Sequence, residues 1–142
     1  MTVVDLLKLE TQLTGEEGRK NYPYTDSRGN ITIGVGRNLT GVGLRDGEIE
    51  TLYQNDIAQV QSDLAANLPW VFDLDEVRLR VFYDLCFNMG VTTLLGFKDM
   101  LAHAQAGNWN TAAGALQNSA WYEEVGGRAV KLVAMLQTGL DQ

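Results

Sequence analysis

Residues 17–36 read EGRKNYPYTDSRGNITIGVG and decide how the beginning of the chain folds. The turn-forming run from Asp26 to Asn30 precedes the β-branched run Ile31–Ile33. Glycine, asparagine and aspartate favour tight turns, and β-branched residues favour strands. This order predicts a strand, a turn and a second strand between Tyr22 and Gly36.

Three side chains in the same window are suited to acid–base chemistry: Glu17, Asp26 and Thr32. A hairpin that follows a helix end would bring them to one edge of a cleft. Two carboxyl groups on opposite sides of a bond are the minimum that glycoside hydrolysis requires. Glu10 and Glu16 are nearby rivals for the role of Glu17. In the purely structural alternative, Asp26 is an ordinary turn residue and Thr32 an ordinary strand residue.

The rest of the chain has helical spacing of its apolar residues. Helices are expected over residues 3–13, 46–68, 75–89, 97–106, 109–118 and 128–138. Gly15 and Gly18 end the first pattern, and Pro69 ends the second. Asp73 followed by Glu76 resembles a capping box for the 75–89 helix. That helix is apolar on most sides, so we expect it at the centre of a helical bundle, with Cys86 in the core.

Composition excludes several kinds of protein. The chain has 142 residues, 45% of them apolar, which is enough for a packed core. A single cysteine and a single histidine, His103, exclude an internal disulfide and a zinc site built from several such residues. The net charge of -7 argues against nucleic-acid binding. The acidic excess falls in residues 45–76, where we interpret it as a solvated helix face.

These patterns together predict a mostly helical α+β fold made of one domain, residues 1–142, with two lobes. A small β-hairpin lobe spans about 14–45, and a long connecting helix spans about 46–68. A helical-bundle lobe spans about 69–142 and includes the N-terminal helix. Interfaces between lobes are a common place for a ligand cleft.

The N-terminal motif resembles that of the phage-type lysozymes, a family that includes phage endolysins. The motif reads Glu17-Gly18-x5-Tyr24-x-Asp26-x2-Gly29-x2-Thr32-Ile33-Gly34-Val35-Gly36. The C-terminal half is similar to the same family in Asp75–Arg78, Phe87–Gly90, Gly96-Phe97, Trp121-Tyr122, Gly127–Ala129 and Thr138-Gly139. The resemblance therefore covers nearly the whole chain in order.

The resemblance implies a lysozyme-like fold and hydrolysis of the β-1,4 bond between N-acetylmuramic acid and N-acetylglucosamine in peptidoglycan, with inversion. It assigns Glu17 as the general acid and gives Asp26 and Thr32 the placement of the attacking water. Arg128 matches a family arginine that approaches the catalytic glutamate. Phe87 matches a position on the cleft floor, although core packing explains this residue equally well. Arg37 stands where the family has a histidine.

The expected partners are peptidoglycan glycan strands. We expect no cofactor, no metal, no nucleic acid and no stable membrane insertion, and we expect a monomer. The start of the chain lacks the basic and apolar regions of a signal peptide. By analogy with endolysins, the resemblance then implies synthesis in the host cytoplasm and action on the cell wall in the periplasm after release.

Three alternatives remain open from sequence. A lytic transglycosylase uses an acid but lets the sugar close on itself, so it has no need to place a water. A chitinase-like glycosidase would act on a different polymer. A catalytically silent wall-binding domain would keep the fold without the reaction.

Overall fold

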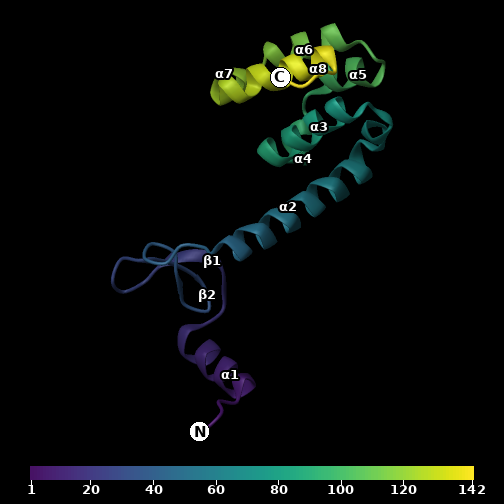
Figure 1. Cartoon of the computed structure of the whole chain (residues 1–142). Helices are drawn as coiled ribbons and strands as arrows, with labels where there is room; N and C mark the ends of the chain where they lie inside the picture. Colours follow the sequence, from purple (N-terminus) through teal and green to yellow (C-terminus); the bar gives the residue numbers. More distant parts are fainter. The chain divides into compact units, whose positions relative to one another are not determined.

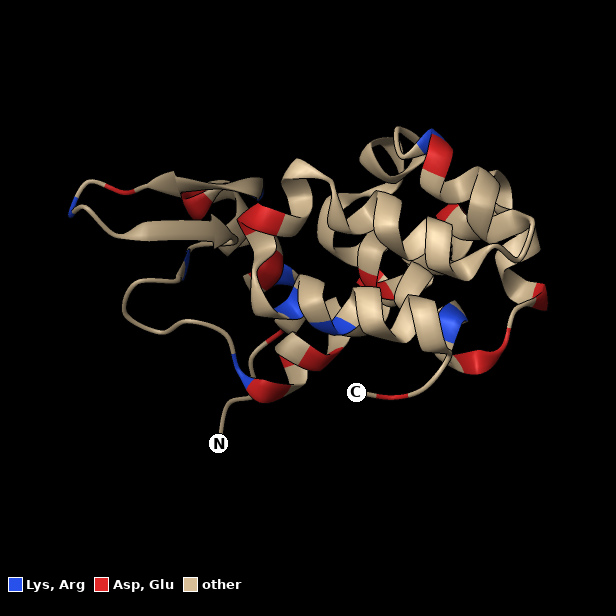
Figure 2. Ribbon diagram, turned by 90° about the horizontal axis from the view of Figure 1, so that it is seen from above, with Lys and Arg blue, Asp and Glu red and all other residues tan.

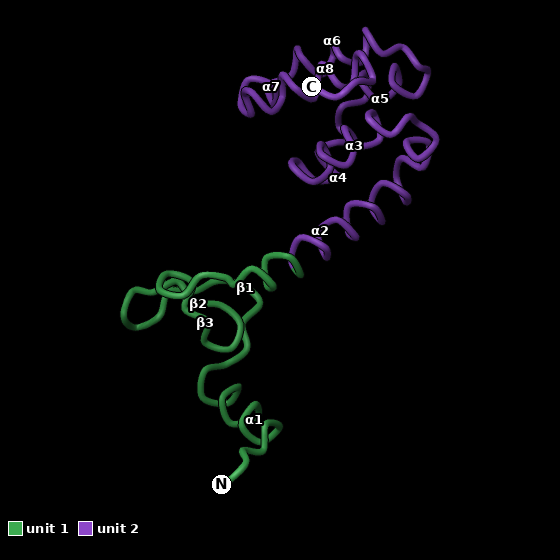
Figure 3. The backbone as a smooth tube through the Cα atoms, viewed as in Figure 1, with its two compact units in different colours: residues 1–51 green, residues 52–142 purple.

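A computed structural model describes all 142 residues. The chain forms eight α-helices, one 3-10 helix and one three-stranded antiparallel sheet (Figure 1). This confirms the predicted fold class, a mostly helical α+β protein. The chain divides into two compact units, Met1–Thr51 and Leu52–Gln142 (Figure 3).

The sheet belongs to the first unit. Its strands are β1 (Lys20–Thr25), β2 (Ile31–Gly34) and β3 (Arg37–Asn38), with β2 in the middle. Thr25 pairs with Ile31 across the first hairpin, and Ile33 pairs with Arg37 across the second. The first hairpin was predicted. The third strand was not, because two residues are too few to give an alternating pattern.

Helix α1 (Leu6–Glu17) precedes the sheet and differs from the predicted helix at both ends. It begins later because Asp5 caps it: the Asp5 carboxylate accepts hydrogen bonds from the backbone N–H groups of Leu7 and Lys8, both at 3.1 Å. It also runs past Gly15 and ends at Gly18, where φ is 78° and the N–H donates to the Thr14 carbonyl at 2.9 Å. Glu17 is therefore the last helical residue.

Helix α2 (Asp46–Asn67) agrees with the predicted 46–68 helix to within one residue and contains the boundary between the two units. Its first turn holds Asp46 and Glu48, whose charges suit the N-terminal end of a helix. Pro69 then opens the 3-10 helix η1 (Pro69–Asp73). None of the helices in the chain is both long and apolar enough to cross a bilayer.

The second unit is all helical. Its helices after α2 are α3 (Glu76–Met89), α4 (Val91–Leu95), α5 (Lys98–Gln105), α6 (Trp109–Gln117), α7 (Ala120–Val125) and α8 (Gly127–Thr138). The prediction that Asp73 caps α3 is wrong: the Asp75 carboxylate accepts the hydrogen bond from the Arg78 N–H at 3.1 Å. Helices α4 and α7 were not predicted, because helices of five and six residues show little periodicity.

Helix α3 supplies the middle of the core, as its apolar composition predicted. Phe82 and Leu85 are fully buried, and Cys86 is 3% exposed. The Phe82 ring meets Trp70 edge to face, with ring centroids 5.4 Å apart. Burial also raises the pKa of the Cys86 thiol, because a thiolate is poorly solvated there.

Arg78 ties the start of α3 to the end of α8. Its guanidinium donates to the carbonyl oxygens of Leu136 and Gln137, each at 2.8 Å. The same group lies 4.2 Å from the centroid of the Trp109 ring, within cation–π range. Carbonyls at a helix C-terminus lack partners within the helix, so a cation placed there stabilises the end of α8.

Replacing Leu85 with alanine should lower the free energy of unfolding of the second unit by about 2–5 kcal/mol, because a fully buried side chain leaves a cavity. Chemical denaturation of the two proteins measures the difference. Val130→Ala is the matched control: Val130 is exposed on α8, so its effect should stay within about 0.5 kcal/mol. Equal losses for both variants would contradict this description of the core.

Candidate functional site

Glu17 lies against the turn between β2 and β3. A Cβ atom built on Gly36 would stand 3.1 Å from Oε2 and 3.2 Å from Cδ of Glu17, so the backbone approaches the carboxyl group closely. Gly36 also has φ of 71°, a conformation that residues with a side chain rarely adopt. The positive φ favours glycine at this position, and a Cβ here would force the Glu17 side chain to shift by a few tenths of an ångström.

Asp26 occupies the turn between β1 and β2 and is held by the turn itself. One carboxylate oxygen, Oδ1, accepts hydrogen bonds from the backbone N–H groups of Arg28 and Asn30, both at 2.8 Å. The other oxygen, Oδ2, accepts one from the side-chain amide of Asn30 at 3.3 Å. Figure 2 shows the whole ribbon with Lys and Arg in blue and Asp and Glu in red; residues 26–30 contain one of each kind, Asp26 and Arg28.

These bonds act on the charge of Asp26. The hydrogen bond from the Asn30 N–H is the main reason that the pKa of Asp26 lies below its ordinary value. The Arg28 N–H, the Asn30 amide and the Arg28 charge lower the pKa further, and desolvation opposes them. The turn therefore favours an ionised carboxylate at neutral pH.

Thr32 lies on the central strand and is 4% exposed. It is opposite Tyr24 on β1 and opposite Asn38 on β3. Its hydroxyl donates a hydrogen bond to the Asn30 carbonyl at 3.2 Å. Alternate residues of a strand share a face, so Thr32 is on the same face of the hairpin as Asn30, and Asp26 follows Tyr24 on that face. Asp26 and Thr32 are thus linked through Asn30, which bonds to both side chains.

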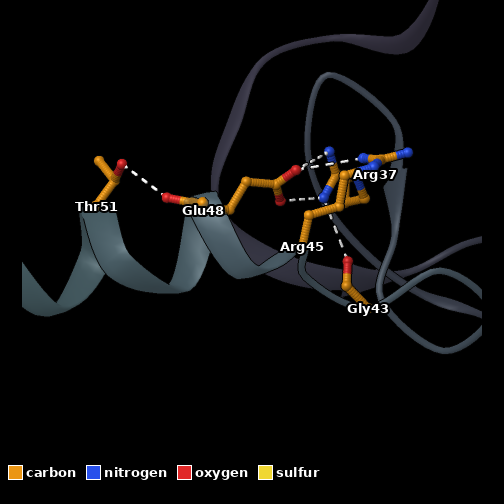
Figure 4. A network of polar contacts seen from close by, with 6 residues as sticks. Arg37, Gly43, Arg45, Glu48 and Thr51 are labelled. Carbon is orange, nitrogen blue, oxygen red and sulfur yellow. Dashed lines mark hydrogen bonds and ion pairs between the residues drawn. The ribbon is translucent and has the colours of Figure 1, made fainter.

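A second polar cluster joins β3 to the first turn of α2 (Figure 4). Arg37 donates to both carboxylate oxygens of Glu48, with an Nη2 to Oε1 distance of 2.8 Å, and Nη1 also donates to the Gly43 carbonyl at 3.2 Å. Arg45 donates to the same Glu48 oxygen, Oε1, at 3.2 Å. The bidentate geometry fixes the end of the sheet to the helix. The sequence does not predict this cluster, because nothing in the local pattern links Arg37 to Glu48.

Arg128 and Phe87 belong to the second unit and line one groove there, of about 550 Å³. Phe87 is 44% exposed. The Arg128 guanidinium is paired with Asp84 on α3, with an Nε to Oδ1 distance of 2.8 Å. This partner was not predicted, because it is 44 residues away along the chain.

The five predicted site residues thus fall into two sets. Glu17, Asp26 and Thr32 lie in the first unit, where the sheet connects Asp26 to Thr32 and its second turn contacts Glu17. Arg128 and Phe87 line the groove of the second unit. The catalytic and substrate-binding roles of all five remain predictions.

The chain is similar in sequence to known proteins along nearly its whole length. Residues 14–137 match the sequence model of the family described as phage lysozyme. The chain is 24% identical to probable T4-type lysozyme 1 and 26% identical to probable T4-type lysozyme 2 of Dictyostelium discoideum, with 92% of this chain and 94% of each relative covered. It is also 26% identical to the pre-baseplate central spike protein Gp5 of Enterobacteria phage T4, over 94% of this chain but only 28% of that protein.

The Arg37–Glu48 cluster makes stability depend on pH. The hydrogen bond from Arg37 is the main reason that the pKa of Glu48 falls from 4.5 to about 2. A carboxyl with a depressed pKa stabilises the fold above its unfolded pKa, and this contribution is lost as the pH falls toward the folded value. Glu48→Gln should therefore lower the melting temperature at pH 7, and the difference from wild type should shrink as the pH falls from 4.5 to about 2.

The measurement is thermal unfolding of both proteins across that pH range. Glu10→Gln serves as the control, because Glu10 is an exposed residue of α1 outside the cluster. A melting-temperature difference for Glu48→Gln that stays constant with pH would show that the cluster does not hold Glu48 in its charged form.

Proposed function

The chain belongs to the phage lysozyme family, and from this membership we propose that it is a lysozyme, a glycoside hydrolase that acts on peptidoglycan. The proposal is supported by the presence in the first unit of a helix-terminal Glu17, an Asp26 whose pKa lies below its ordinary value, and Thr32. The bond cleaved is the β-1,4 bond between N-acetylmuramic acid and N-acetylglucosamine, and the reaction inverts the anomeric configuration.

Glu17 is the general acid. It is exposed at the last residue of α1, and its carboxyl group has no hydrogen-bond or ion-pair partner within its own unit. A carboxyl group in this position is free to meet a substrate oxygen. Its proton passes to the glycosidic oxygen as the bond from that oxygen to the anomeric carbon breaks.

Asp26 is the base that receives a proton from the attacking water. Its depressed pKa keeps it ionised, which a base or a stabiliser of positive charge on the sugar ring requires. Oδ1 is occupied by two backbone N–H groups, whereas Oδ2 has a single bond at 3.3 Å and can accept a hydrogen bond from water.

The steps balance with these residues alone. The water oxygen bonds to the anomeric carbon, the glycosidic bond breaks, Glu17 gives up one proton and Asp26 takes one. Inversion requires the two carboxyl groups to stand about 6.5–9.5 Å apart, so that a water fits on the far side of the sugar. A lytic transglycosylase needs no water, so the pairing of Asp26 with Thr32 on one face favours hydrolysis.

Replacing Glu17 with glutamine should reduce the release of muropeptides from purified sacculi by a factor of about 10²–10⁴, the usual contribution of a general acid. Mass spectrometry of the products identifies the bond cleaved. Hydrolysis gives reducing ends on N-acetylmuramic acid, whereas anhydromuramic ends would show a transglycosylase.

Glu16→Gln is the matched control for that experiment. Glu16 is an exposed glutamate next to Glu17 in the same helix, and its only bond is one from the Gln12 amide at 3.3 Å. Its rate should stay within about twofold of wild type. Full activity in Glu17→Gln would remove the assignment of the acid, and an inactive wild-type protein would remove the proposed function.

The contact between Gly36 and Glu17 offers a second test. Gly34→Ala and Gly36→Ala both place a side chain at positive φ, at 67° and 71°, and should each cost about 1–2 kcal/mol of stability. Only at Gly36 does the new Cβ meet Glu17, because nothing lies within 4 Å of a Cβ at Gly34. Gly36→Ala should therefore lower kcat by about three- to tenfold more than Gly34→Ala, since small misplacements of a catalytic group are costly.

Initial rates on sacculi and thermal unfolding, measured on both variants, separate the two effects. Equal stability losses with equal rates would mean that the turn does not influence the position of the Glu17 carboxyl group.

A further inference from the structure

Asn30 is the one residue that bonds to both side chains proposed to place the water. Its backbone N–H donates to Asp26 Oδ1 at 2.8 Å, and its side-chain amide donates to Asp26 Oδ2 at 3.3 Å. Its carbonyl oxygen accepts the Thr32 hydroxyl at 3.2 Å and the Asp26 N–H at 2.8 Å. The two side chains are thereby oriented through a single residue.

The direction of these bonds has a chemical consequence for Thr32. A hydroxyl group has one hydrogen, and Thr32 gives it to the Asn30 carbonyl. The oxygen of Thr32 can then only accept a hydrogen bond from a further partner. An ionised Asp26 is likewise an acceptor only. A water molecule that meets both groups must donate both of its hydrogens to them.

A water oriented in this way is a prepared nucleophile. With both hydrogens directed at the protein, its lone pairs remain free to attack the anomeric carbon. A Thr32 hydroxyl free to rotate could instead donate to the water and occupy a lone pair. The carbonyl of Asn30 prevents this, and the 4% exposure of Thr32 limits competition from bulk water.

We propose that Asn30 is a positioning residue of the lysozyme reaction, which orients Asp26 Oδ2 and the Thr32 hydroxyl so that the attacking water donates to both. The proposal rests on the proposed function and specifies how the water is placed. The side-chain amide of Asn30 acts through Asp26, and the backbone carbonyl of Asn30 acts through Thr32.

The pKa of Asp26 also depends on the charged and titratable groups around it. Arg28 is the charged group whose field lowers the pKa of Asp26. The titratable residues of β1 are Lys20, Tyr22 and Tyr24, β2 carries none, and β3 carries Arg37. Removing the Asn30 amide takes away one bond to the charged form, so the pKa of Asp26 rises. Because Asp26 must be ionised, the acidic limb of the pH profile of kcat moves to higher pH.

The test compares Asn30→Ala with the wild-type chain by two readouts. In the first, kcat and KM are measured on soluble glycan fragments of peptidoglycan across a range of pH. We expect kcat to fall about three- to tenfold, as for the loss of one hydrogen bond, with KM nearly unchanged and the acidic limb shifted upward. In the second, carboxyl-carbon NMR follows the titration of Asp26 itself, which should occur at higher pH than in wild type.

Two further variants make the result specific. Asn30→Asp keeps the shape of the side chain but replaces the donor with a second carboxylate, so it should shift the Asp26 titration upward by more than Asn30→Ala. If thermal unfolding shows that Asn30→Ala does not fold, the same kinetic and titration measurements are made on Asn30→Asp instead. Ser27→Ala is the matched control in the same turn, because the Ser27 side chain makes no hydrogen bond. Its kcat and its Asp26 titration should equal those of wild type.

The outcomes separate the two proposals. If the wild-type chain is active and the Asn30 variants match Ser27→Ala in kcat, acidic limb and titration, the Asn30 side chain does not position Asp26; the proposal is then overturned and the proposed function stands. If wild type cleaves nothing, the proposed function fails and this proposal fails with it, whereas the titration still reports whether Asn30 holds the charge of Asp26.

Discussion

A carboxylate held inside a tight turn is the constraint around which the first unit is arranged. Three N–H groups, from Arg28 and Asn30, point at Asp26, and together they close the turn between β1 and β2. The closed turn fixes which residues stand opposite each other, because register in a hairpin follows from the turn. With the register fixed, Thr32 shares a face with Asp26. The same bonds that stabilise the fold therefore also fix the charge and the location of the proposed base.

The second unit depends on different forces. Its core is apolar and surrounds α3, whose Phe82 and Leu85 are fully buried. Long-range arginine contacts then join its elements: Arg78 reaches the last turn of α8, and Arg128 pairs with Asp84. Ion pairs that are partly exposed contribute little stability compared with a buried core. The Asp84 carboxylate partly neutralises the charge that Arg128 presents in its groove.

Much of the fold could be predicted from the sequence, and the reasons are physical. Helices α2, α3 and α8 are long enough for their apolar spacing to be recognised, and the run from Asp26 to Ile33 has strong turn and strand preferences. The short elements β3, α4 and α7 carry too few residues for a period to be visible. The N-cap of α3 was assigned two residues early, because Asp73 and Asp75 are chemically equivalent in a sequence.

The candidate site was predictable in part. The motif drew attention to Glu17, Asp26 and Thr32, and the structure adds how they are held. Asn30 was read only as a turn residue, because the direction of its bonds to Asp26 and Thr32 depends on backbone geometry. The pairs of Arg37 with Glu48 and of Arg128 with Asp84 join residues far apart along the chain. Such pairs are determined by tertiary packing, which local sequence patterns do not predict.

The single thiol of the chain gives a direct view of local opening. Cys86 lies at the core of the second unit, and its raised pKa keeps it in the unreactive protonated form. A disulfide reagent can therefore react with it only when α3 becomes accessible, so the rate of labelling counts these excursions. The first unit has no cysteine, so local opening of the sheet or of α1 does not change the labelling rate. The rate of local opening of the second unit can thus be measured without attaching a probe.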